Sequence, residues 1–214
     1  MSLHTEVILL VSGDFPNNLD EHLNTFSELS FWNEIKSVPI IPENSAIFDW
    51  VSKGFTGQLS RKEGTRLLSH IHALRKYIYE STADSLFIIE DSVTYTSEFE
   101  SMVSKILSDL QNPEYKHYDF VSFGLNTSGN RGNLEANFNN SNYDRYTLYR
   151  NGPESNGLSA YWMRRSYAHR CLEILDRPFY LYPEVNSSLL FRYGTGLLIE
   201  PPLVHDEYPS KRHF

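Results

Sequence analysis

Two adjacent carboxylates, Glu90 and Asp91, directly follow the apolar run 86–89. An unbroken apolar run downstream of a helix predicts a buried parallel strand, so the acids fall at its C-terminal end. Open α/β sheets bind ligands at that edge. Two acids held together there need a cation or a hydrogen-bonding ligand, and hard oxygen ligands suit Mg²⁺ or Mn²⁺ bound with a phosphate group. The alternative interpretation is a solvated strand end that caps the next turn.

Strands and helices alternate through the first 125 residues, which indicates a Rossmann-like α/β fold. We expect a mostly parallel central sheet flanked by helices, followed by a smaller part with loops and short strands. Apolar runs predict strands over 6–14, 37–42, 86–89, 118–124, 146–149, 157–163 and 197–200. Helical spacing of apolar residues predicts helices over 20–30, 62–80, 97–110 and 166–175. Residues 203–214 read as a polar tail.

Composition excludes several classes of protein. The formal net charge of −8 argues against a nucleic-acid partner bound through its phosphates. Cys171 is the single cysteine, so no disulfide framework or cysteine-based zinc site is expected. The sequence shows no signal peptide and no apolar run near the ~20 residues that span a bilayer, so we expect a soluble cytoplasmic protein. It has neither a Gly-X-Gly-X-X-Gly fingerprint nor a P-loop, which disfavours dinucleotide oxidoreductases and P-loop enzymes.

Four segments point together to a family. They are Ser69-His70-Ile71 on a helix, Leu-Phe-Ile-Ile-Glu-Asp-Ser-Val over 86–93, Gly-Leu-Ser-Ala-Tyr over 157–161, and Pro-Pro-Leu-Val over 201–204. In this order they resemble the family 25 glycosyltransferases, the lipopolysaccharide-biosynthesis type with a GT-A fold. The likeness covers residues 57–210 and is strongest from Ser-His to Glu-Asp. It implies a single GT-A-like domain over 1–214, with a nucleotide-binding half over 1–125 and an acceptor half over 126–214.

The resemblance implies transfer of a hexose from a nucleotide sugar, with a UDP-hexose as the expected donor and a glycan or other hydroxyl acceptor. It also implies Mn²⁺ or Mg²⁺ on the diphosphate, with Glu90, Asp91 and His205 as expected ligands. The family's acidic motif ends in Glu-Asp-Asp, whereas Ser92 stands at the third position here. Either the two acids hold the metal themselves or metal use is weakened. His205 has the alternative interpretation of an exposed tail histidine.

Other residues are expected to contact the donor. Arg61 and Arg66 open the helix before the acidic strand and suit a phosphate or a sugar hydroxyl, although solvated helix charges would look the same. His70 either packs its helix near the acidic strand or contacts the ligand directly. The nucleoside is expected against Val11-Ser12-Gly13, because a glycine lets a ring approach the backbone closely; a plain turn glycine is the alternative.

A general base is expected between residues 182 and 186. An inverting transferase needs one to deprotonate the acceptor hydroxyl. The resembled family has a Pro-X-Asp element before its last strand, and this chain has Pro183-Glu184-Val185-Asn186. Glu184 is the only carboxylate there and is the expected base. If Asn186 occupies the family's aspartate position instead, base catalysis in the family's manner is in doubt, and retention or hydrolysis becomes possible.

Two further functions compete with a transferase. Ser92 and Asn186 both point toward lost chemistry, which favours a degenerate transferase fold that binds a nucleotide sugar or carbohydrate without turnover. The acidic strand end alone also suits an unrelated metal-dependent phosphotransferase or nucleotide hydrolase, which would act without any sugar.

Overall fold

A computed structural model describes residues 4–12, 19–27, 32–46, 61–124, 143, 145–150, 159–175 and 195–206 of the chain. Its helices are α1 Leu19–Ser27, α3 Arg61–Glu80, α4 Phe99–Asp109, α5 Arg165–Leu175 and the short 3₁₀ helix η2 Pro113–Tyr115. Its strands are β1 Thr5–Val11, β2 Trp32–Pro39, β3 Ser85–Glu90, β4 Val93–Tyr95, β5 Phe120–Ser122, β6 Thr147–Arg150, β7 Ala160–Arg164, β8 Gly196–Glu200 and β9 Val204–Asp206.

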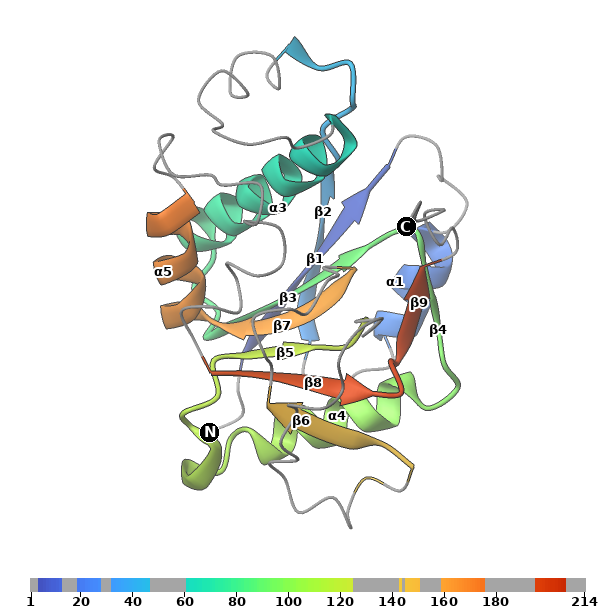
Figure 1. The fold of residues 1–214 in the computed structure, drawn as a ribbon, viewed down its shortest axis with the longest axis vertical. Helices are drawn as coiled ribbons and strands as arrows, with labels where there is room; N and C mark the ends of the chain where they lie inside the picture. The colour runs from blue at the N-terminus through green and yellow to red at the C-terminus, as the bar shows by residue number, and fades with distance from the viewer. Residues whose placement is uncertain are drawn as a thin grey trace.

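The central sheet has seven strands in the order β2-β1-β3-β7-β5-β8-β6 (Figure 1). The strands β2, β1 and β3 form a parallel group, and β7 runs antiparallel between β3 and β5. The α/β class is confirmed, but three of the six pairings that the structure describes within this sheet are antiparallel, so the sheet is mixed rather than mostly parallel. A short apolar run such as residues 160–163 reads the same in either direction, so sequence pattern could not reveal this.

The chain reverses its direction across the sheet at β1. It passes from β1 to β2 on one side, and then crosses back to place β3 on the other side of β1. Right-handed crossovers in opposite directions require their helices on opposite faces of the sheet. Accordingly, α3 and α5 cover one face, and α1 and α4 cover the other (Figure 1). The carboxyl ends of β1 and β3 therefore form a topological switch point, where open α/β sheets bind ligands.

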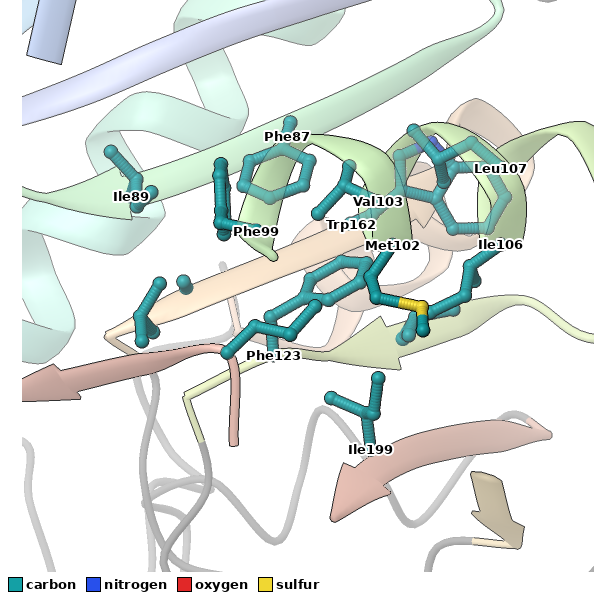
Figure 2. Close-up of a cluster of buried hydrophobic side chains, with 14 of the residues drawn as sticks. Phe87, Ile89, Phe99, Met102, Val103, Ile106, Leu107, Phe123, Trp162 and Ile199 are labelled. Atoms are coloured by element: carbon teal, nitrogen blue, oxygen red, sulfur yellow. The ribbon is translucent and has the colours of Figure 1, made fainter. Parts of the chain in front are cut away.

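Alternation along β3 divides the core into two layers. Leu86 and Ile88 pack on the side of α3 and α5, whereas Phe87 and Ile89 pack on the side of α4. Figure 2 shows Phe87 beneath Phe99 and Val103 of α4, with side chains of the neighbouring strands completing this layer. All six residues of β3 are buried, which explains why an apolar run identified this strand so well.

A second, two-stranded sheet joins β4 to β9 and was not expected from the sequence. The prediction of a polar tail from residue 203 is wrong for its first part, because Leu203 and Val204 are buried and Val204 pairs with Tyr95. Strands of three residues are too short to show a period. The strand predicted over 37–42 also begins earlier, as β2 starts at Trp32. None of the described helices combines the length and apolar character needed to cross a membrane.

Gly124 marks the closest approach between the main sheet and β9. A Cβ atom there would lie 2.6 Å from Cγ2 of Val204, 3.0 Å from Oγ of Ser159 and 3.3 Å from the backbone nitrogen of Ala160. We expect Gly124→Ala to destabilise the fold by about 1–3 kcal/mol, because the buried valine has no room to move. Urea denaturation measures the change. Val204→Ala in the same background should recover part of it, and strictly additive effects of the two substitutions would contradict the steric explanation.

Candidate functional site

The carboxyl ends of β1 and β3 are joined by hydrogen bonds around Asp91. Its backbone N–H donates to the carbonyl of Leu10 at 2.9 Å. Its Oδ2 atom accepts the backbone N–H of Ser12 at 2.6 Å and the Ser12 hydroxyl at 3.2 Å. Ser12 directly follows β1 and Asp91 directly follows β3, so these bonds fix the two strand ends to each other at the switch point.

Glu90 is the centre of a buried polar chain on the α3 side of the sheet. Arg66 donates from both Nε and Nη2 to the two carboxylate oxygens of Glu90. His70 Nε2 donates to Oε1 of Glu90 at 2.9 Å, and Nδ1 of the same ring lies 2.9 Å from the hydroxyl of Tyr161. A carboxylate only accepts, so Nε2 carries a proton, and in the neutral ring Nδ1 accepts from the tyrosine. One hydrogen-bonded path thus links α3, β3 and β7.

The environment of Glu90 favours its ionised form. Burial alone would raise its pKa, but the charge of Arg66 and the hydrogen bonds from His70 and Arg66 outweigh burial and lower the pKa from 4.5 to about 2. The Glu90 side chain is 5 % exposed and the Arg66 side chain is 38 % exposed, so the carboxylate of the pair is buried and the arginine reaches the protein surface. Burial also raises the pKa of Tyr161 well above its usual value, which keeps this hydroxyl protonated.

The backbone of Asp91 is contacted from α1, on the opposite face of the sheet from α3. His22 on α1 donates from Nε2 to the backbone carbonyl of Asp91 at 3.0 Å, and the Tyr95 hydroxyl bonds to the other ring nitrogen of His22. Burial raises the pKa of Asp91, against the lowering effect of the Ser12 hydrogen bonds. Its Oδ1 atom is buried and has no hydrogen-bond partner. The two acids are adjacent in sequence, but Glu90 accepts from Arg66 and His70 whereas Asp91 accepts from Ser12.

The Ser69-His70 pair on α3 has a structural explanation. The Ser69 hydroxyl donates to the carbonyl of Thr65 at 2.7 Å and accepts the backbone N–H of Ile41 at 2.9 Å, just beyond β2. His70, one residue along, bonds to Glu90 at the end of β3. Successive residues of the helix therefore hold the carboxyl ends of β2 and β3, the two strands that flank β1. The bond to Glu90 places His70 beside the acidic strand, and direct contact of His70 with a ligand stays a prediction.

The remaining predicted site residues fall in different places. Val11 ends β1, next to Ser12. Arg61 is exposed and donates from Nη1 to the carbonyl of Glu43 at 2.6 Å, away from Glu90. His205 is exposed on β9, where it pairs in register with Thr94. Three predicted residues, Gly13, Glu184 and Asn186, lie outside the residues that the structure describes, so their roles stay predictions.

The carboxylates do not fit a metal ion. Glu90 Oε1 accepts two hydrogen bonds and Oε2 a third, all from cationic or imidazole N–H groups. Asp91 Oδ2 accepts two more from Ser12. Within the described parts of the chain, no three His, Cys, Asp or Glu residues gather closely enough to hold a metal. The expected set of Glu90, Asp91 and His205 gains no support from this geometry, and we derive no step through a metal ion.

Sequence reasoning missed His22 and Tyr95 as parts of this region. His22 stands four residues before Phe26, which places both side chains on the buried face of α1, and both are about 1 % exposed. A histidine on an apolar helix face was the available signal. Tyr95 gave none, since β4 is too short to recognise. His22, Phe26 and Tyr95 pack as an aromatic cluster beneath the Asp91 turn.

Comparison with models of known protein families gives no match, and comparison with curated proteins gives none either.

The Glu90 ion pair should be visible in acid denaturation. A lowered pKa in the folded state stabilises the fold above the unfolded value of 4.5, and this contribution is lost as the pH falls toward about 2. We expect Glu90→Gln to lower the free energy of unfolding at neutral pH by about 2–3 kcal/mol and to flatten its decline in acid. Urea denaturation across this pH range measures both effects.

The exposed Glu80, the last residue of α3, offers a matched control for Glu90. Glu80→Gln makes the same chemical change without breaking a buried pair, so we expect it to leave the neutral-pH stability within about 0.5 kcal/mol of the wild type. An equal acid decline in the wild type and in Glu90→Gln would show that Glu90 is not held ionised by its partners.

Proposed function

We propose that this chain is a glycosyltransferase that moves a hexose from a nucleotide sugar, with a UDP-sugar as the first candidate, to a glycan or other hydroxyl acceptor. The observation that carries the proposal is the polar cluster at the switch point. This cluster consists of Ser12, Arg66, Glu90 and Asp91, at the carboxyl ends of the paired strands β1 and β3. The connections from these strands run in opposite directions there, and α/β sheets bind nucleotides at such an edge. A purely structural strand end would not need so many buried polar groups.

The ordered segments that resemble family 25 support the same proposal. In the strongest part of this resemblance, His70 is hydrogen-bonded to Glu90, and the neighbouring Ser69 accepts the backbone N–H of Ile41 beyond β2. The third segment ends in β7, which pairs with β3 in the central sheet. The fourth segment, residues 201–204, leads into β9. We also propose a GT-A fold for the chain. In that fold the parallel group β2-β1-β3 lies within the nucleotide-binding half, residues 1–125.

The chemistry follows from the leaving group. A nucleoside diphosphate gains negative charge as the glycosidic bond breaks, so the site must present cations or N–H donors to its oxygens. Arg66 is partly exposed at this edge, and its orientation is fixed by two bonds to Glu90. We propose that Arg66 faces the diphosphate and that Ser12 and Asp91 border the nucleoside. Deprotonation of the acceptor is assigned to Glu184.

One observation favours a second function, binding without turnover. Ser92 replaces the third acid of the resembled motif, and both Glu90 oxygens are occupied by protein donors. A site with these features can still recognise a nucleotide sugar. The two functions differ in a single measurable property, because a binding module never releases free nucleotide.

The first experiment incubates the purified chain with a panel of UDP- and GDP-sugars, in Mn²⁺ or in EDTA, and measures released nucleotide. We expect release from one donor at a rate well above its spontaneous hydrolysis. A donor that raises the melting temperature without any release would support the binding module. No binding and no release with any donor would overturn both functions.

Asp91→Asn tests the site within the same assay. We expect it to lower nucleotide release by about tenfold or more, because the amide removes the negative charge at the strand end, although its oxygen can still accept the two Ser12 donors that bond to Oδ2. Asp84→Asn is the matched control, since Asp84 is exposed and immediately precedes the opposite end of β3. Equal activity in the two variants would remove Asp91 from the site.

A further inference from the structure

The adjacent acids of the switch point do not act as a pair. Glu90 continues the register of Leu86 and Ile88, so its side chain lies in the α3 layer, where Arg66 and His70 hold it. Asp91 is bonded to Ser12 at the end of β1, and its backbone carbonyl is held by His22 from α1. The two carboxylates are therefore held by separate partners, Glu90 by α3 and Asp91 by the end of β1, and do not converge on one ion in this structure.

The acceptor capacity of Glu90 is also committed. Its Oε1 atom accepts from Arg66 Nε and His70 Nε2, which uses both lone pairs of that oxygen. Its Oε2 atom accepts from Arg66 Nη2. A metal ion on Glu90 would have to displace a bidentate guanidinium, the strongest type of carboxylate partner, and would then lie beside its positive charge. Asp91 Oδ1 is the one carboxylate oxygen of the two residues with no partner in the described structure.

We infer that Glu90 is a positioning residue that orients Arg66 and His70, that Asp91 alone is the ligand-facing acid, and that nucleotide binding at this edge needs no divalent cation held between them. This inference rests on the proposed function for the identity of the ligand. It departs from the metal-dependent chemistry that the acidic sequence motif suggests. The charge of the diphosphate is then met by protein donors, with Arg66 as the fixed guanidinium.

The test measures cation and nucleotide binding in the wild-type protein, so that it does not depend on a variant that folds. Mn²⁺ is added to isotopically labelled protein, with and without UDP, and broadening of the amide signals of Ser12 and Asp91 is followed by NMR. Calorimetry measures UDP affinity in Mn²⁺ and in EDTA. We expect no selective broadening without UDP, and UDP affinities that agree within about threefold. Selective broadening of both amides by micromolar Mn²⁺ alone would overturn the inference.

Variants separate the two acids. We expect Glu90→Gln to weaken UDP binding by mispositioning Arg66, equally in Mn²⁺ and in EDTA, and Arg66→Gln to reproduce the loss. A tenfold or larger gain of UDP affinity from Mn²⁺ that disappears in both Glu90→Gln and Asp91→Asn would establish a shared metal site and overturn the inference. Glu6→Gln removes a different buried acid, paired with Lys36 on β2 at 3.0 Å, and controls for general destabilisation.

Failure of the proposed function gives a different result. If UDP and every nucleotide sugar fail to bind in either condition, the glycosyltransferase proposal is overturned. The Mn²⁺ titration then tests by itself whether Glu90 and Asp91 share a metal ion. No selective broadening at Ser12 and Asp91 would support separate roles for the two acids, and selective broadening would overturn them.

Discussion

The bidentate contact between Arg66 and Glu90 is the interaction on which the ligand edge of this fold depends. It joins the N-terminal part of α3, the longest described helix, to the last residue of a fully buried strand. His70 adds a second bond from the same helix and passes the connection to Tyr161 on β7. Because an unpaired carboxylate at this depth would be costly, the position of α3 against the sheet and the ionisation of Glu90 are coupled. The parallel group therefore has a rigid carboxyl edge.

The other layer holds the same edge by different means. Asp91 connects the ends of β3 and β1 through Ser12, and His22 and Tyr95 support its backbone from α1 and β4. Hydrogen bonds to a backbone carbonyl and to backbone N–H groups fix the turn itself, whatever ligand is present. Glu90, the last residue of β3, follows the alternation of this strand into the α3 layer, whereas Asp91 lies beyond the strand and is held by Ser12 and His22.

Much of the fold was readable because its signals are local. The helix over 62–80 and the strand over 86–89 were predicted within one residue of α3 and β3 at each end, since strong periodicity and full burial leave little ambiguity. Strand direction and the pairing of β4 with β9 depend on partners far along the chain, which no local pattern encodes. At the site, residue types drew attention to Glu90 and Asp91, but their partners decide what they do. The likeness to metal-binding acids could not reveal that Arg66 already occupies one of them.

The energetics of the ion pair bear on why these residues are present at all. Replacing a buried salt bridge by apolar side chains of similar volume is often neutral or stabilising, so a need to hold α3 does not by itself explain Arg66 and Glu90. The neighbouring contacts of α3 with β1 and β3 already bury Leu67, Ile71 and Leu74 in a continuous apolar layer. What a leucine could not do is present a guanidinium in a fixed orientation at a partly exposed sheet edge. Glu90 accepts both N–H groups on one side of Arg66 and so determines the direction in which its charge is displayed. This arrangement supports the proposal that the sheet edge recognises an anionic ligand.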